Sequence, residues 1–168
     1  MVMQRIANPY YVYKRRVGST PTLSAIFLFL FLFSCHPAVA YDDIIAELRN
    51  YVTVEVNTES CERDKKTDGW YIPWENKIHF CKNNIIQGWP ADKHDSVFRK
   101  VLLHEAVHVA QDCKAGFSNN ILENISVNTV VPEYVKKRYS KEWHDIEAEA
   151  FFYWHKGNKP LELVKEYC

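Results

Sequence analysis

The sequence lacks an excess of either charge, because its 21 lysines and arginines equal its 21 aspartates and glutamates. A balanced chain creates no strong field toward nucleic acid or acidic membranes, so the composition excludes nucleic acid as an expected partner. The sequence also lacks internal repeats, and it lacks low-complexity segments beyond its first forty residues. Its 168 residues therefore leave room for one compact domain with a single modest core.

The chain has no apolar run long enough to cross a bilayer. Its longest run, within residues 23–33, is shorter than the roughly 20 residues that a transmembrane helix needs. Basic residues precede this run and Ala38-Val39-Ala40 follows it, which is the order of a secretory signal peptide. We therefore expect residues 1–40 to be a signal peptide cleaved after Ala40. Residues 41–168 would then form a secreted or periplasmic domain with no stable membrane span.

Two alternatives to this cleavage stay open. The apolar run could be kept as a membrane anchor, or the sequence Leu32-Phe33-Ser34-Cys35, which resembles a bacterial lipobox, could lead to acylation of Cys35. Phe33 is bulkier than the residue usual at that place in the motif.

Four of the 21 basic residues and none of the acidic ones lie in residues 1–40, so the mature domain has 17 basic against 21 acidic side chains. The working domain is mildly acidic.

The cysteines include no C-x-x-C pair, which argues against a structural zinc ribbon. After signal cleavage an even number remains in an oxidising compartment, namely Cys61, Cys81, Cys113 and Cys168. Four cysteines allow three pairings. We favour Cys61 with Cys81, which would staple a local β-region, and Cys113 with Cys168, which would tie the C-terminus to the main helix.

Periodicity and turn signals predict an α+β domain with a small antiparallel edge sheet or hairpin beside a helical half. Two aromatic and β-branched stretches separated by Glu75-Asn76 indicate the hairpin, and apolar residues at helical spacing indicate the main helix. The expected elements are a helix at 42–52, a polar loop at 53–66, strands at 70–74 and 77–81, a loop at 82–95, the main helix at 96–113, an irregular segment at 114–131, and helices beginning at Pro132, at 143 (ending near 156) and at Pro160.

The main helix carries the residues with the clearest chemistry. His104 and His108 are four residues apart, so they lie one turn above each other on the same helix face and can bind one ion. Zn²⁺ accepts two neutral imidazoles with a carboxylate and a water. Glu105 lies at the edge of that face, where it can act as a general base on the water without being a ligand. The apolar residues around these three predict a buried helix, in which unpaired polar groups would be costly.

His104-Glu105-Ala106-Val107-His108 resembles the H-E-x-x-H motif of the zincin metallopeptidases. The metzincin branch is excluded, because Gln111 and Lys114 stand where its glycine and third histidine would be. In the gluzincin branch a glutamate on a later helix is the third ligand, and residues 146–151 resemble that motif with Glu147 in the ligand position. The resemblance implies a zincin-like domain that cleaves a peptide or protein substrate.

The third ligand stays open between two glutamates. An apolar stripe through Ile146, Ala150 and Trp154 also favours Glu147, because an inward carboxylate there would need a cation as partner. Phe151 stands where many gluzincins have an aspartate or asparagine, so Glu149 is kept as the alternative, with a solvated position on the helix surface as its usual fate. If neither glutamate binds the ion, His144 or Asp145 is the next candidate for the third ligand.

Weaker candidates surround this group. Gln111 is positioned to support His108 through a hydrogen bond, although a polar residue at the boundary of the helix explains it equally well. Candidates for stabilising an oxyanion are His144, His155, Tyr134, Tyr139 and Tyr153. His79 is expected to pack or to point to solvent, and Asn124 begins a glycosylation sequon. The alternative to an enzyme is a non-catalytic secreted zinc-binding or protein-interaction domain, and an enzyme acting on cell-wall peptides is a third possibility.

Overall fold

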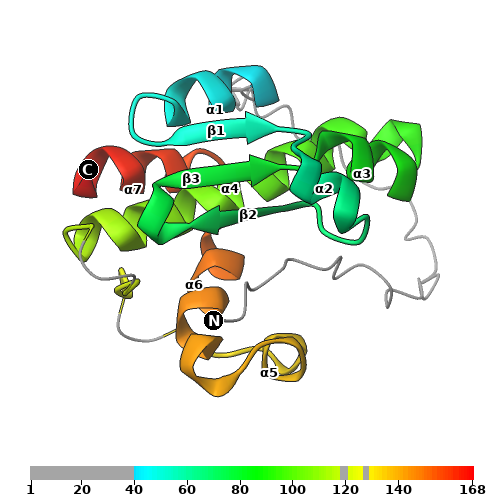
Figure 1. Cartoon of the computed structure of the whole chain (residues 1–168). Helices are drawn as coiled ribbons and strands as arrows, with labels where there is room; N and C mark the ends of the chain where they lie inside the picture. The colour runs from blue at the N-terminus through cyan, green and yellow to red at the C-terminus, as the bar shows by residue number, and fades with distance from the viewer. Residues whose placement is uncertain (1–39, 118–120, 127–128) are drawn as a thin grey trace, which may run out of the picture.

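The computed structural model describes residues 40–117, 121–126 and 129–168, and these form an α+β domain (Figure 1). The predicted signal peptide, its cleavage site and Cys35 lie outside the described residues except for Ala40. The elements in chain order are α1 Tyr41–Leu48, β1 Thr53–Val56, α2 Glu59–Arg63, β2 Gly69–Ile72, η2 Pro73–Glu75, β3 Lys77–Phe80, α3 Lys82–Gly88, η3 Ala91–Lys93, α4 His94–Lys114, α5 Glu133–Arg138, η4 Lys141–Trp143, α6 His144–Tyr153 and α7 Lys159–Tyr167.

The sheet contains the predicted hairpin and one strand more. β2 pairs antiparallel with β3, with Gly69 opposite Phe80 and Ile72 opposite Lys77, and η2 with Asn76 connects them. Asn76 has a φ of 48°, a left-handed conformation that asparagine tolerates in turns. β1 pairs parallel with the other side of β3, so the sheet is mixed, with the order β1-β3-β2. β2 is therefore an edge strand.

The long helix α4 forms the centre of the domain. α1, α7 and the sheet pack around it on one side and α6 packs on the other, as Figure 1 shows. Gly69 allows β2 to approach α4 closely, because a Cβ at this position would lie 2.8 Å from Val101 Cγ1. The main apolar core lies between α1, the sheet, α4 and α7, and includes Leu48, Phe80 and Leu102, all fully buried. One side of α4 is thus fixed by apolar packing, which leaves the side toward α6 for the polar residues.

Two segments that we expected to be loops contain regular structure. Residues 53–66 form β1 and α2, and residues 82–95 form α3, η3 and the first turn of α4. The predictions were wrong because these elements are short and mostly polar: Val54 is the one buried residue of β1, and Asn84 and Ile85 are the two buried residues of α3. Their stability comes from tertiary contacts, which a local pattern does not record.

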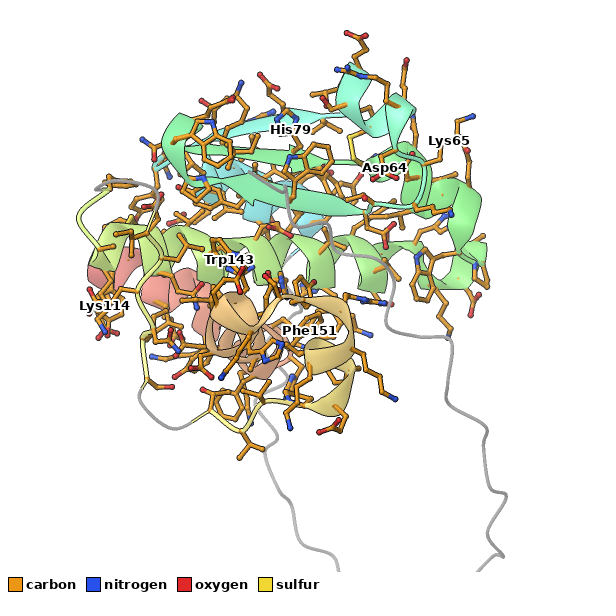
Figure 2. The ribbon with its side chains drawn as sticks, turned by 60° about the horizontal axis from the view of Figure 1, so that its bottom comes forward. Asp64, Lys65, His79, Lys114, Trp143 and Phe151 are labelled. Carbon is orange, nitrogen blue, oxygen red and sulfur yellow. A yellow bond between two sulfur atoms is a disulfide. The ribbon has the colours of Figure 1, made fainter. Side chains whose placement is uncertain are left out.

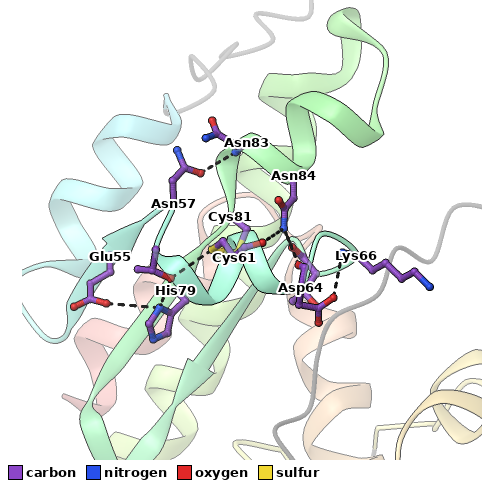
Figure 3. The surroundings of a disulfide bond; sticks show 11 residues. Glu55, Asn57, Cys61, Asp64, Lys66, His79, Cys81, Asn83 and Asn84 are labelled. Atoms are coloured by element: carbon purple, nitrogen blue, oxygen red, sulfur yellow. Dashed lines mark hydrogen bonds and ion pairs between the residues drawn. A yellow bond between two sulfur atoms is a disulfide. The ribbon is translucent and has the colours of Figure 1, made fainter.

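Both predicted disulfides are present. Cys61–Cys81 joins α2 to the residue that follows β3 (Figure 3). Cys113–Cys168 joins the last turn of α4 to the C-terminus. Beside the first disulfide, the Asn84 side-chain amide donates to the carbonyl oxygens of Cys61, Asp64 and Thr67 at 2.8 to 3.2 Å. This single buried amide satisfies the backbone of the turn that follows α2.

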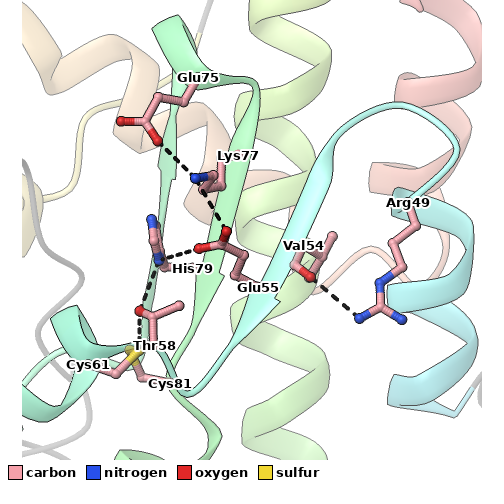
Figure 4. Close-up of polar contacts among 9 residues, drawn as sticks. All are labelled: Arg49, Val54, Glu55, Thr58, Cys61, Glu75, Lys77, His79 and Cys81. Atoms are coloured by element: carbon pink, nitrogen blue, oxygen red, sulfur yellow. Dashed lines mark hydrogen bonds and ion pairs between the residues drawn. A yellow bond between two sulfur atoms is a disulfide. The ribbon is translucent and has the colours of Figure 1, made fainter.

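The face of the sheet that points away from α4 carries its own polar group. The His79 ring stacks on Trp70 with centroids 4.7 Å apart, and its Nδ1 contacts Thr58 Oγ1 at 3.0 Å and Glu55 at 3.6 Å (Figure 4). Lys77 bridges Glu55 and Glu75 beside it. Of the two positions expected for His79, packed or pointing to solvent, the structure shows the packed one. In Figure 2 His79 lies across α4 from Phe151 of α6, so it does not belong to the histidine pair of α4.

Within the described residues, no helix is long and apolar enough to span a membrane. The two disulfides are typical of a protein that folds in an oxidising compartment.

Candidate metal centre

α4 is buried on all sides along most of its length. Every residue from 101 to 113 is buried, although five of them are polar or charged: His104, Glu105, His108, Gln111 and Asp112. A helix enclosed in this way is normally apolar all round. Buried polar groups need partners, so these five side chains mark the part of the helix where packing alone does not explain the sequence.

The structure brings His104, His108 and Glu147 together. Their potential ligand atoms all lie within 4.8 Å of one another, and all three residues are buried. The Glu147 carboxylate reaches both rings, with Oε2 3.3 Å from His104 Nε2 and Oε1 3.6 Å from His108 Nε2. The two Nε2 atoms are 3.1 Å apart. Two imidazole nitrogens and a carboxylate therefore converge from two helices, as the spacing on α4 predicts.

The close approach of α6 to α4 positions Glu147. Ala148 and Ala150 are the small residues of α6, and both are buried, with 1% and 0% of their surface exposed. Phe151 packs edge-on against the His104 ring at 4.5 Å between centroids, and Trp154 lies at 6.3 Å. His104 Nδ1 is buried and has no hydrogen-bond partner among the described residues. His104 is thus held by aromatic packing.

Burial keeps the two histidines neutral. It lowers the pKa of His104 to about 3, and it also lowers the pKa of His108, where the carboxylate of Glu147 acts in the opposite direction. Burial raises the pKa of Glu147, which the neighbouring His108 opposes. Neutral imidazole is the form that binds a metal ion, so the fold favours the binding-competent state of both rings.

Glu105 lies one position from His104 and is equally buried, with 1% of its surface exposed. Within the part of the chain that the structure describes, neither of its carboxylate oxygens makes a hydrogen bond of good geometry. Burial raises the pKa of Glu105 well above its usual value, the charge of Glu147 raises it further, and the backbone of Tyr71 on β2 acts in the opposite direction. The Glu105 carboxylate is therefore close enough to both Glu147 and the edge strand β2 for each to affect its pKa.

Gln111 supports the site, one of the two roles that the sequence allowed. It is completely buried, and its Oε1 lies 2.8 Å from His108 Nδ1. Its Nε2 donates to the Ile146 carbonyl at 3.1 Å and to Glu149 Oε2 at 2.9 Å. Gln111 thus links the second histidine of α4 to α6.

Glu149 does not have the solvated position that we expected. It is completely buried and accepts hydrogen bonds from Gln111, from the backbone N–H groups of Ile125 and Ser126, and from the Ser126 hydroxyl. The expectation failed because the segment 121–126 folds over this side of α6. Glu149 contacts Gln111 rather than the two histidines, so the structure brings Glu147 alone of the two glutamates to the histidine pair.

The histidines and tyrosines proposed from the sequence to stabilise an oxyanion differ in their surroundings. His144 and His155 contact backbone carbonyls, of Tyr139 at 3.0 Å and of Phe151 at 3.2 Å. Tyr139 is buried, and burial, followed by the charge of Glu147, raises the pKa of its phenol. Of the three tyrosines singled out in the sequence, Tyr139 has its pKa shifted by the site carboxylates. Tyr71, whose hydroxyl donates to Asp112 at 2.6 Å, is a neighbour of the site that the sequence did not indicate.

Fold and site together define a small α+β domain with a candidate transition-metal centre of two histidines and a glutamate. Residues 38–168 match the family described as a domain of unknown function, DUF8637, and the chain belongs to this family. No curated protein and no solved structure matches it significantly. The site geometry therefore carries the functional argument.

Proposed function

We propose that the chain is a secreted zinc-dependent metallohydrolase of the zincin type, and that it is a metallopeptidase. The observation that carries this proposal is the buried convergence of His104, His108 and Glu147. The equally buried Glu105 is close enough to Glu147 for the charge of Glu147 to raise its pKa. Three protein ligands and an open position can activate a water, and a nearby carboxylate can take its proton.

The donor atoms fit zinc in kind and in number. Two imidazoles and one carboxylate leave one position of a tetrahedral site open for water or substrate. Among the described residues, Glu147 Oε2 and both oxygens of Glu105 are buried and make no hydrogen bond of good geometry. Such groups are costly in a folded protein unless a cation compensates them. When bound, Zn²⁺ supplies a Lewis acid that polarises a carbonyl group and lowers the pKa of water.

Glu105 is assigned as the general base and not as a ligand. It would accept a proton from the attacking water and pass it to the leaving amine. The pKa of Glu105 is raised by burial and by the negative charge of Glu147. A divalent cation beside both carboxylates acts in the opposite direction and favours the ionised form that a base requires.

The neighbouring strand supports a peptide substrate. β2 is an edge strand. The backbone of Tyr71, in the middle of β2, lowers the pKa of Glu105. An extended peptide can bind by adding a strand to such an edge, which would place its amide groups along β2 and next to Glu105. This arrangement favours peptide bonds over other amides.

Removal of the metal tests the proposal. The zinc-loaded chain should hydrolyse a labelled unstructured protein, a chelator should abolish the hydrolysis, and added Zn²⁺ should restore it. Release of labelled fragments measures the rate. Hydrolysis that persists in the chelator would contradict the metal mechanism, and absence of hydrolysis in a chain that holds zinc would leave the non-catalytic zinc-binding domain.

A further inference from the structure

The side-chain amide of Gln111 can adopt only one orientation in its surroundings. One end of the amide faces the Ile146 carbonyl at 3.1 Å and Glu149 Oε2 at 2.9 Å. Both of these atoms are acceptors, so the NH₂ group of Gln111 must point toward them. The reversed amide would place three acceptor oxygens against one another in a buried site. The Gln111 oxygen therefore faces His108.

Glu149 is held in place as firmly as Gln111. Its Oε1 accepts from the Ser126 backbone N–H at 2.5 Å and from the Ser126 hydroxyl at 2.9 Å. Its Oε2 accepts from the Ile125 backbone N–H at 2.7 Å and from Gln111. Every acceptor position of the carboxylate is in use, and each partner is a donor. Glu149 thus presents a fixed acceptor to Gln111.

We propose that Glu149, acting through Gln111, is a positioning residue that fixes the tautomer of His108. Because the Gln111 oxygen can only accept, His108 Nδ1 must carry the ring proton and donate it across the 2.8 Å contact. His108 Nε2 is then left with its lone pair, and this is the nitrogen that lies 3.6 Å from Glu147 Oε1. The ring is set for metal binding before a metal arrives.

The chain of contacts also extends to the backbone of the segment 121–126. Ile125 and Ser126 donate to the carboxylate that orients Gln111, so the docking of this segment on α6 and the state of His108 belong to one hydrogen-bonded network. A change of Glu149 therefore reaches the site without touching a proposed ligand. The consequence for zinc rests on the proposed function, whereas the tautomer does not.

Nitrogen NMR of the histidine rings in the metal-free chain tests the tautomer directly. At neutral pH, long-range proton–nitrogen spectra of the unmodified chain should show His108 with a protonated Nδ1 and an unprotonated Nε2. The opposite tautomer would overturn the proposal. This readout needs neither zinc nor activity, so a chain that fails to bind zinc would defeat the proposed function and leave the tautomer measurement valid.

The variant Glu149→Gln tests the role of the carboxylate. The introduced amide can turn its NH₂ group toward Gln111, which removes one of the two acceptors that fix the Gln111 amide and leaves the Ile146 carbonyl as the other. We expect a mixture of the two His108 tautomers in place of the single Nδ1–H form, and a 10- to 100-fold weaker zinc affinity, on the order of other outer-shell changes. Asp145→Asn makes the same chemical change on the exposed side of α6 and should alter neither the His108 tautomer nor the zinc affinity.

Two results would reject this role. A Glu149→Gln chain that keeps both the tautomer and the zinc affinity of the unmodified chain shows that the carboxylate does not act through Gln111. If Glu149→Gln does not fold, Gln111→Met removes the acceptor for His108 Nδ1 directly and should give the same mixed tautomers. Retention of the Nδ1–H form in Gln111→Met would overturn the proposal equally.

Discussion

Replacement of Glu147 by alanine is expected to abolish zinc binding at micromolar metal. Glu147 is the carboxylate that reaches both His104 Nε2 and His108 Nε2, at 3.3 and 3.6 Å, so its loss leaves two histidines on one helix face. Two imidazoles do not complete a three-ligand zinc site. We expect the dissociation constant to rise by more than about 100-fold, beyond the effect of outer-shell partners. Competition with a chromophoric chelator measures it.

Two other acidic residues of α6 provide the comparison. Asp145→Ala removes an exposed carboxylate two positions earlier and should leave zinc affinity within about a few-fold. Glu149→Ala should have an intermediate effect, because Glu149 acts through Gln111 and not on the ion. The expected order of loss is therefore Glu147, then Glu149, then Asp145. A Glu149→Ala chain that loses more zinc than Glu147→Ala would transfer the ligand role to Glu149.

The substitution Glu105→Gln is expected to keep zinc and to remove catalysis. An amide has almost the same shape as the carboxylate but cannot accept the proton from water, so the turnover number should fall by about 100- to 10,000-fold. The folded chain should be at least as stable as the unmodified one, because the change removes a buried carboxylate that makes no hydrogen bond of good geometry with the described residues. Turnover of an unstructured protein and thermal unfolding measure the two effects.

The same substitution in α7, Glu166→Gln, serves as the matched control, since Glu166 is exposed. It should change neither turnover nor zinc content. If Glu105→Gln lost its zinc, Glu105 would be a ligand and the assignment of roles would be wrong. If it kept full turnover, the site would not use Glu105 as its base. Zinc binding without turnover in the unmodified chain would support the non-catalytic domain instead.

The sequence predicted the parts of the fold that carry strong local patterns. Apolar residues at helical spacing located α4 within two residues at its N-terminal end, and the two aromatic stretches located the hairpin of β2 and β3. β1 was missed because its four residues bury Val54 alone, and its partner strand lies more than twenty residues further along the chain. Pairing between such distant short segments is a tertiary property that no local pattern contains.

The site, like the fold, was predictable only where a local sequence pattern marks its residues. The pair His104 and His108 follows from helix geometry, and the structure brings Glu147 to it as the apolar stripe on α6 indicated. The burial of Glu149 was not predictable, because it depends on the segment 121–126 lying over α6. Tyr139 was one of ten tyrosines in the sequence, and only the fold singles it out beside Glu147.

The metal content of the purified chain tests the central claim most directly. Full-length protein equilibrated with Zn²⁺ and dialysed against metal-free buffer should retain one zinc per chain by elemental analysis. The same treatment of His104→Ala and His108→Ala should leave less than about a tenth of this amount, on the order expected when one of three ligands is lost. An unmodified chain that retains no zinc, or variants that retain as much as it does, would contradict a metal centre formed by His104, His108 and Glu147.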